Sequence, residues 1–496
     1  MGAGKGKTMK IRQLIKKIPV EKITGTSNIN VKGITYDSRR VEKDFLFVAI
    51  PGFKVDGHNF IREAWEKGAR TFVIEKDIGF SLPGAVLIKV SSSRLALAQI
   101  SNVFYGFPSQ KIKVVGITGT NGKTTTIYLI QSIFKKAGLK AGRISTIDYN
   151  VGDNFYPATV TTPESKDLQE LFKRMLENKM DWVVMEVSSH SLVLHRVEGI
   201  DFDWAVFTNL SPEHLDFHRS IDKYLEAKLS LFKKMGQEKK SAINIDDPAS
   251  EKILKNTNCQ IFTYGMMKKA DFMADTLNRS SFLLRAKGKK TKINFSLLGI
   301  HNVYNALAAA AVTIEEGVSL NLVKEGLEDV KRVPGRLELI PNKASLKIYV
   351  DYAHTQDGLE KVLRALRQIN KGRLIVVFGC GGDRDSYKRP LMGKVAFQNA
   401  DLCIITSDNP RSEDPKLIIS QIEEGLKSSG AKLNKDYFLI PDRREAIAFA
   451  LNKLNKNDTL LVAGKGHERV QIFKDRVIKF NDKDVIQDLL SEKGML

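Results

Sequence analysis

The chain has 496 residues, which is too long for one compact core and predicts about three domains, so a single small binding module is excluded. Apolar residues make up 42% and charged residues 27%, values typical of a folded globular protein and not of a disordered or fibrous one. The net charge of +21 favours an anionic partner, which could be nucleic acid, lipid headgroups or phosphorylated small molecules.

Cysteine use and hydropathy bear on the cellular compartment. Cys259, Cys380 and Cys403 are scattered and odd in number, which disfavours a disulfide framework or a zinc site and favours a reducing cytoplasm. The longest stretch without charged residues, around 297–314, contains a histidine and asparagines, so it predicts a polar-striped helix start and not a bilayer span. The basic N-terminus lacks an unbroken apolar segment, and no signal peptide is expected.

The first domain is predicted to follow a short tail. The string GAGKGKT at residues 2–8 looks like a phosphate loop, but only three residues separate Gly2 from Gly6 and no apolar strand precedes it. Residues 1–10 are therefore predicted to be a flexible tail. From 11 to 108, short apolar runs mixed with Gly and Pro turns are typical of a small α/β domain.

Two larger α/β domains are predicted beyond it. Over residues 109–333, β-branched apolar runs alternate with helical segments, including helices from about Lys123 and Ile221, which predicts a doubly wound parallel sheet. Pro and Gly in RVPGR mark the next boundary, and the alternation restarts over 334–496, predicting a Rossmann-like domain. Polar residues follow four of its strands, where ligands bind in open parallel sheets: Asp351 and His354, 379–385, 408–411 and 464–468.

The strongest local signal is VVGITGTNGKTTT, in which a hydrophobic strand runs into a Gly-rich turn and then a helix. In such a loop, backbone N–H groups hold phosphate oxygens, Lys123 neutralises the β- and γ-phosphates, and the Thr124 hydroxyl can ligate Mg²⁺. Five residues, not the usual four, separate Gly116 from Gly122. The alternative is a Gly-rich turn without a ligand, but the strand, turn and helix together predict an ATP site made of Gly119, Thr120, Asn121, Gly122, Lys123, Thr124 and Thr125.

Candidate metal ligands follow two later strands. The run VVMEVSSH places Glu186 at a strand end, where a buried carboxylate needs a counter-charge that Mg²⁺ can supply. The next apolar run ends in TNLSPEHLDFH, with His214, Asp216 and His218. Their spacing matches no zinc template, so an oxygen-rich Mg²⁺ site is favoured, while helix capping and surface polarity remain the alternative for Asp216 and His218.

Over nearly its whole length after the tail, the chain resembles the Mur ligase family. The family's motifs occur in the family's order: YDSRR, GFKVDGHNFI, ITGTNGKTTT, MEVSSHSLVLHRV, FTNLSPEHLDFH, EAKLSLF, GIHNVYNALAA, GRLE, VDYAHT, FGCGGDRD, KRPLMG, SDNPRSEDP and VAGKGHE. The resemblance implies that ATP phosphorylates the free carboxylate of UDP-MurNAc-L-Ala-D-Glu and that an amine then displaces phosphate. It also implies a cytoplasmic monomer of peptidoglycan precursor synthesis with small-molecule substrates, no nucleic acid and no membrane insertion.

The resemblance assigns roles residue by residue. Lys228, in EAKLSLF, matches a lysine that CO₂ converts to a carbamate (N6-carboxylysine) that binds a second Mg²⁺, with His214 and Glu186 as further ligands; composition alone would favour a solvated helix-face lysine. Positions that contact ATP in the family are matched by Asn305, Arg336 and Asp351. Positions that hold the UDP-MurNAc-dipeptide are matched by Ser38, Thr161, Thr162, Ser188 and Arg196. Leu194 and Val160 stand where some relatives have Gln and Asn.

The incoming amine is predicted from the segment DNPR, the family's signature for meso-diaminopimelate. Arg411 can clamp the extra carboxylate of this amino acid bidentately, whereas L-lysine, the alternative amine, would bring an ammonium that arginine repels. Glu468 suits the distal ammonium. Without the resemblance to the family, the segment DNPR would be interpreted as a turn, because Asn-Pro favours turn initiation. The full predicted set is Arg389, Asp408, Asn409, Pro410, Arg411, Gly464 and Glu468.

Two other functions compete with this one. A basic ATP-dependent nucleic-acid-binding protein would interleave aromatic residues with Lys and Arg, but aromatic residues make up only 8% and lie mostly inside apolar runs. A ligase similar to folylpolyglutamate synthetase shares several motifs. It is disfavoured by the N-terminal domain, which matches the family's uridine-binding domain, and by the segment DNPR.

Overall fold

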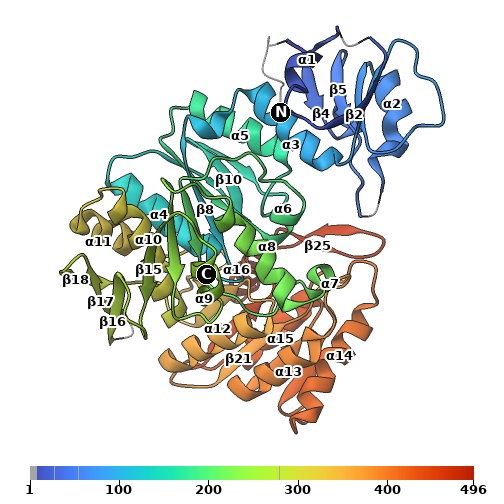
Figure 1. Cartoon of the computed structure of the whole chain (residues 1–496). Helices are drawn as coiled ribbons and strands as arrows, with labels where there is room; N and C mark the ends of the chain where they lie inside the picture. Colours follow the sequence, from blue (N-terminus) through green and yellow to red (C-terminus); the bar gives the residue numbers. More distant parts are fainter. Residues whose placement is uncertain (1–7, 27, 54, 279) are drawn as a thin grey trace. The chain divides into compact units, whose positions relative to one another are not determined.

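The computed structural model describes residues 8–26, 28–53, 55–278 and 280–496 (Figure 1). The chain divides into two compact units, Met1–Gly116 with Leu139–Trp204, and Ile117–Gly138 with Ala205–Leu496. Residues 2–7 of the GAGKGKT string, and most of the predicted tail, lie outside the described residues. Residues 9 and 10, predicted to belong to the tail, instead form β1 (Met9–Lys10), which pairs antiparallel with β3 (Asn30–Val31).

The N-terminal part of the first unit is the predicted small α/β domain. Its five-stranded sheet has the order β2-β7-β6-β5-β4, parallel except for β2, and separate apolar clusters cover its two faces. The strands are β2 (Val20–Thr24), β4 (Gly33–Thr35), β5 (Phe45–Val48), β6 (Thr71–Ile74) and β7 (Val86–Val90). The helices are α1 (Ile11–Leu14), η1 (Ser38–Arg40), η2 (Gly57–Phe60), α2 (Ile61–Glu66), α3 (Ser93–Tyr105) and η3 (Pro108–Gln110).

The rest of the first unit carries Glu186 at the end of a buried strand. This strand, β12, pairs parallel with β9, and β9, β10 and β11 follow one another antiparallel. Helix α5 packs against α3 of the N-terminal domain. The elements are β9 (Ala141–Ile144), β10 (Asp148–Val151), β11 (Asn154–Pro157), α5 (Ser165–Glu177), β12 (Trp182–Glu186) and α6 (Ser189–Val193).

The second unit begins within β8 (Lys113–Thr118), which leads into α4 (Lys123–Lys136). Helices α4 and α8 begin at Lys123 and Ile221, as predicted. The predicted parallel sheet is present, since β14, β15 and β16 pair in parallel, and β17 and β18 extend it with two antiparallel strands. The further strands are β13 (Trp204–Phe207), β14 (Lys240–Asn244), β15 (Gln260–Gly265), β16 (Phe272–Asn278), β17 (Ser281–Ala286) and β18 (Lys289–Asn294). The further helices are α7 (Leu215–His218), α8 (Ile221–Lys233), α9 (Ser250–Lys255), α10 (Ile300–Glu315) and α11 (Leu320–Asp329).

The C-terminal part of the second unit is a six-stranded sheet with the order β19-β20-β24-β21-β22-β23 and an apolar cluster on each face. Because β20, β24, β21 and β22 are adjacent and parallel, the four predicted strand ends share one edge. The strands are β19 (Glu338–Leu339), β20 (Lys347–Asp351), β21 (Leu374–Phe378), β22 (Leu402–Ile405), β23 (Tyr437–Leu439) and β24 (Thr459–Ala463), with a separate hairpin of β25 (Val470–Ile472) and β26 (Val477–Lys479). The helices are α12 (Gln356–Ile369), α13 (Lys388–Asn399), α14 (Pro415–Ser428), α15 (Arg443–Lys453) and α16 (Asp482–Glu492).

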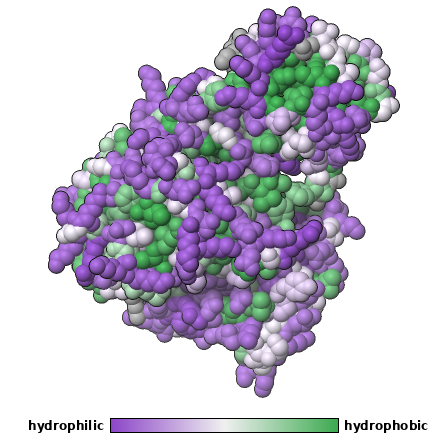
Figure 2. All heavy atoms as spheres, in the orientation of Figure 1, coloured by the Kyte–Doolittle hydropathy of each residue, from purple (hydrophilic) through white to green (hydrophobic). Residues whose placement is uncertain are grey.

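The surface carries much of the positive charge. Figure 2 shows a face that is largely hydrophilic, and the lysines of the β17–β18 hairpin, Lys287, Lys289, Lys290 and Lys292, are all exposed. Among the described helices, none combines the length and the apolar character that a membrane span requires.

Candidate active site

The Gly-rich loop between β8 and α4 requires glycine at two positions. Gly119 has φ +145° and Gly122 has φ +89°, a region that favours glycine. A Cβ on Gly119 would lie 1.9 Å from Thr208 Oγ1, and one on Gly122 would lie 2.3 Å from Asn305 Oδ1. The loop is therefore built for close approach of neighbouring groups to its backbone.

Lys123 stands at the first position of α4, with its ammonium above its own loop. The Nζ atom donates to Gly119 O at 2.9 Å and to Thr120 O at 2.8 Å. Asn209 holds the same loop from outside, since its carbonyl accepts from Thr120 N at 2.8 Å and its side chain accepts from Asn121 N at 3.0 Å. The turn thus places a cation and a helix N-terminus at one point, as phosphate binding requires.

Lys228 of α8 is buried beneath this loop and is not the solvated helix-face lysine that composition favoured. Its Nζ donates to Gly119 O at 2.9 Å and lies 4.2 Å from the centroid of the Tyr224 ring. Burial, followed by the charge of Lys123, lowers the pKa of the Lys228 amine well below its usual range. A neutral amine at this position is a nucleophile.

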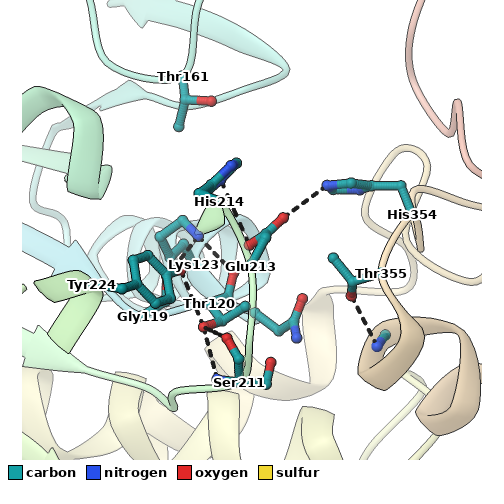
Figure 3. A network of polar contacts seen from close by, with 12 residues as sticks. Gly119, Thr120, Lys123, Thr161, Ser211, Glu213, His214, Tyr224, His354 and Thr355 are labelled. Carbon is teal, nitrogen blue, oxygen red and sulfur yellow. Dashed lines mark hydrogen bonds and ion pairs between the residues drawn. The ribbon is translucent and has the colours of Figure 1, made fainter. Parts of the chain in front are cut away.

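A buried carboxylate joins two histidines beside Lys123 (Figure 3). Glu213 Oε1 lies 3.0 Å from His354 Nε2, and Glu213 Oε2 lies 3.7 Å from His214 Nε2. Burial alone would raise the pKa of Glu213, but the His354 hydrogen bond and neighbouring positive charges hold it well below its usual range. His354 Nδ1 also lies 2.8 Å from Tyr352 O, so both ring nitrogens of His354 face oxygen atoms.

His214 offers a neutral ring at this point. Its backbone has φ +58°, at the N-terminus of α7. Burial lowers the pKa of His214 to about 4, against the opposing attraction of Glu213, so a ring nitrogen lone pair is available at neutral pH. Of the two other residues in the predicted cluster, Asp216 is exposed and His218 is buried against Phe217 and Tyr224.

The predicted ATP contacts gather around α4. Arg336 Nη2 donates to Thr124 Oγ1 at 3.0 Å, and its guanidinium lies 4.6 Å from the centroid of the Tyr352 ring. Asn305 of α10 accepts from Thr126 Oγ1 at 3.4 Å. Thr125 is buried in the first turn of α4.

Asp351 ends β20 and holds the segment that carries Arg336. Its carboxylate accepts from Leu337 N at 2.6 Å and from Ala353 N at 2.7 Å. Burial raises the pKa of Asp351, although Arg336 opposes the rise. The side chain therefore fixes backbone next to Arg336.

Asp357, in the first turn of α12, contacts the Gly-rich loop and was not predicted. Its carboxylate accepts from Asn121 Nδ2 at 2.9 Å, from Ser211 Oγ at 3.2 Å and from Lys361 Nζ at 2.7 Å. Sequence reasoning also missed Asn209, Glu213 and Tyr224. The only available signal was the adjacency of Glu213 to His214.

A second polar cluster lies in the first unit. Glu186 Oε1 accepts from Thr146 N at 2.9 Å, and Thr161 Oγ1 lies 3.3 Å from Thr146 Oγ1. Thr162 Oγ1 lies 2.9 Å from Glu186 O and 3.2 Å from Ser188 Oγ. Glu186, Thr161, Thr162 and Ser188 thus form one cluster.

The remaining predicted residues of this unit differ in their surroundings. Arg196 Nη1 donates to Thr162 O at 3.2 Å and so belongs to the same cluster. Ser38, in η1, instead donates to Glu63 Oε2 at 3.1 Å within the N-terminal domain. Val160 is exposed, and Leu194 follows the last residue of α6.

The C-terminal sheet edge assembles the DNPR segment with the last two predicted residues. Asn409 Nδ2 donates to Glu468 Oε2 at 2.7 Å, and Lys465 Nζ donates to the same oxygen at 2.9 Å. Gly464 has φ +109°, and a Cβ there would lie 2.6 Å from Asp408 Oδ2. Within the described part of the chain, this Asp408 oxygen is buried without a hydrogen-bond partner.

Arg411 and Pro410 lock this segment against the loop after β21. Arg411 Nη1 donates to Gly382 O at 2.6 Å, and its backbone N–H donates to Ile472 O at 3.0 Å. A Cβ on Gly382 would lie 1.9 Å from Pro410 O. Burial, followed by the charge of Arg384, lowers the pKa of Arg411, so its guanidinium would be stabilised by an additional anion.

Arg389 is buried, with a side chain only 1% exposed, and its contacts are to protein groups. Its Nη1 donates to Glu413 Oε2 at 2.8 Å and to Gln421 Oε1 at 2.6 Å, while its Nη2 donates to Gly381 O at 3.1 Å. Arg389 therefore holds the loops of this site together, whatever else it binds.

Glu413→Gln is expected to destabilise the protein by about 3 kcal/mol, because it leaves the buried Arg389 charge unpaired. The hydrogen bond from Arg389 lowers the pKa of Glu413. A lowered carboxyl pKa means that the stabilisation is complete above the unfolded-state pKa and is lost as the pH falls through the folded-state value. The Tm, measured by thermal unfolding from pH 7 to pH 3, should fall more steeply for the wild type than for Glu413→Gln. Parallel curves of Tm against pH would contradict this assignment.

Comparison with known proteins gives a consistent result. The family descriptions "Mur ligase family, catalytic domain", "Mur ligase middle domain" and "Mur ligase, glutamate ligase domain" match residues 30–105, 117–313 and 335–466. A Caldanaerobacter subterraneus protein named "UDP-N-acetylmuramoyl-L-alanyl-D-glutamate--2,6-diaminopimelate ligase" is 45% identical, covering 98% of this chain and 99% of that protein. A Clostridium botulinum protein of the same name is 46% identical, covering 93% and 95%.

Solved structures agree with these sequence matches. A structure carrying the same diaminopimelate ligase name has a TM-score of 0.67 at 29% identity, covering 98% of this chain and 100% of that one. MurF from Acinetobacter baumannii has a TM-score of 0.68 at 20% identity, covering 98% and 99%, which is a likeness of fold.

Proposed function

The chain belongs to the Mur ligase family, and we propose that it is an ATP-dependent ligase joining meso-diaminopimelate to the D-glutamyl side-chain carboxylate of UDP-MurNAc-L-Ala-D-Glu. Its place would be the cytoplasmic synthesis of peptidoglycan precursors. The strongest structural support is the meeting of Arg411, Asn409 and Glu468 at one sheet edge, since a guanidinium and a carboxylate suit an amino acid with charges at both ends.

We further propose one substrate for each predicted domain. Residues 11–108 would bind the uridine end, with Ser38 as a contact, residues 109–333 would bind ATP, and residues 334–496 would bind the amino acid. The protein would act as a monomer on small molecules, with no nucleic acid and no membrane insertion.

The chemistry requires positive charge where two anions meet. The substrate carboxylate attacks the γ-phosphorus of ATP and ADP leaves, and the amine nitrogen then attacks the acyl carbon of the acyl phosphate. The resulting tetrahedral species collapses, with phosphate as the leaving group. Lys123 would exchange its loop carbonyls for the phosphates, and Arg336 and the loop N–H groups would offset the growing negative charge.

The proposed metal ligands are Thr124, Glu186, His214 and a carbamate on Lys228. Among the described residues, no group of three or more His, Cys, Asp or Glu side chains is placed to hold a metal ion. The carbamate would add an anionic oxygen ligand to the proposed set. The set then offers the oxygen atoms that Mg²⁺ prefers, with one imidazole. Mg²⁺, when bound, would neutralise phosphate charge.

Carbamylation fits the surroundings of Lys228. The neutral amine attacks CO₂, an N–C bond forms, and one proton leaves to give the carbamate. The lowered pKa of Lys228 favours the neutral form of the amine, which is the nucleophilic form. The new negative charge would also be attracted to the nearby ammonium of Lys123.

A phosphate-release assay tests the proposed function. Purified protein with ATP, Mg²⁺, UDP-MurNAc-L-Ala-D-Glu and meso-diaminopimelate should release phosphate and form a tripeptide product. The mass of that product should equal the summed masses of the nucleotide-sugar dipeptide and the amino acid, less one water. Omission of either the nucleotide-sugar dipeptide or the amine should abolish that product. Phosphate release that is independent of both substrates would instead indicate a simple ATPase.

A further inference from the structure

One carboxylate in the first unit lies between two guanidinium groups. Glu164 precedes α5, and its side chain is only 10% exposed. Its Oε2 atom lies 2.9 Å from Arg94 Nη1 and 3.3 Å from Arg196 Nε. Arg94 comes from the first turn of α3 in the N-terminal domain, whereas Arg196 follows α6.

Each arginine is also tied to backbone. Arg94 Nη2 donates to Pro51 O at 3.1 Å, and Arg196 Nη1 donates to Thr162 O at 3.2 Å. Glu164 Oε1 accepts from Ser165 N at 3.2 Å. The triad of Arg94, Glu164 and Arg196 therefore links three separate segments of the first unit.

The triad leaves Arg196 with unused hydrogen-bonding capacity. Arg94 makes the hydrogen bond to the shared Glu164 oxygen, while Arg196 Nε is buried and, within the described residues, has no hydrogen-bond partner. Two guanidinium charges against one carboxylate leave a net charge of about +1 in a largely buried place. Such an excess is stabilised when an anion binds.

We propose that Glu164 and Arg94 are positioning residues that hold Arg196 for an oxyanion of the nucleotide-sugar dipeptide. The inference rests on the proposed function, and the oxyanion is either the diphosphate or a carboxylate of the dipeptide. Arginine has many rotamers, and holding it in one of them before binding lowers the ordering cost of the complex.

Two charge-opposed substitutions separate positioning from simple charge. Glu164→Gln raises the local net charge by one and Arg94→Gln lowers it by one. If net charge alone governed binding, the first would tighten the complex and the second would weaken it. If positioning governs, both should raise the Kd for UDP-MurNAc-L-Ala-D-Glu by about tenfold, because both release Arg196 from its fixed place.

The measurements are equilibrium binding of UDP-MurNAc-L-Ala-D-Glu and of UDP, together with steady-state kinetics. The KM for the dipeptide substrate should rise while the KM values for ATP and for the amine stay within twofold. Glu164→Asp should restore part of the affinity. Weaker binding of UDP as well would identify the diphosphate as the anion, and unchanged UDP binding would identify a carboxylate.

Glu170→Gln is the matched control, because Glu170 lies on the same helix and pairs with the buried Lys166 at 2.5 Å. It should leave all of these constants unchanged. Thermal unfolding of each variant shows whether it is folded, and Arg94→Gln leaves the start of α5 intact should Glu164→Gln fail to fold.

Three results would overturn the proposal: tighter binding by Glu164→Gln, an unchanged Kd in both variants, or an equal loss in Glu170→Gln. In each of these the wild type still forms the tripeptide, so the proposed function survives. A wild-type protein that neither binds the nucleotide-sugar dipeptide nor forms product would instead overturn both.

Discussion

Lys228→Ala is expected to lower kcat by about 10³-fold, because it would remove both the carbamate and the metal ligand that the carbamate would provide. Lys228 is 1% exposed and donates to the Gly119 carbonyl at 2.9 Å. Its pKa is lowered well below the usual range, chiefly by burial, which favours the neutral amine that reacts with CO₂. Phosphate release under saturating substrates measures the effect.

Chemical rescue distinguishes a carbamate from a structural lysine. Short carboxylic acids such as acetate should restore part of the activity of Lys228→Ala, because a carboxylate can replace the missing carbamate oxygens. Lys223→Ala is the matched control, since Lys223 is an exposed lysine of the same helix α8, and it should retain full activity. Full activity in Lys228→Ala without added acid would refute the carbamate.

Local signals predicted the elements that open the site. The helix start at Lys123 was predicted from the Gly-rich turn that precedes it, and at Ile221 the structure shows Ser220 as the cap, since its side chain accepts from Lys223 N. The last strand of the hairpin was missed because its sequence lacks the apolar run of a buried strand. This strand, β18 (Lys289–Asn294), is mostly polar and exposed.

Long-range partners in the site could not be predicted. Glu213 contacts His354, which is 141 residues away, and sequence spacing carries no information about such a contact. Similarly, Asp357 reads locally as an ordinary charge in the first turn of a helix, yet it bonds to Asn121 of the phosphate loop. The ligand roles assigned to the site residues stay predictions.

The choice of amine gives the second large effect. The wild type is expected to use meso-diaminopimelate with a kcat/KM at least about 10²-fold above that for L-lysine, because L-lysine has a hydrogen where meso-diaminopimelate has its distal carboxylate and would leave Arg411 facing only the distal ammonium. Arg411 Nη1 donates to Gly382 O at 2.6 Å, which holds the guanidinium, and the Arg411 backbone N–H donates to Ile472 O at 3.0 Å. Equal use of the two amines would contradict the predicted substrate.

Arg411→Ala should lower kcat/KM for meso-diaminopimelate by about 10²-fold and leave the low value for L-lysine nearly unchanged, so that the selectivity disappears. Arg411→Lys should recover little, because an ammonium cannot form the bidentate contact. Arg476→Ala is the control, since Arg476 is an exposed arginine in the turn between β25 and β26, and it should keep the wild-type preference. If Arg411→Ala instead lowered the kcat/KM for both amines equally, Arg411 would support the loop after β21 and would not bind the distal carboxylate. The ratio of the two kcat/KM values therefore separates recognition of the amine from support of the fold.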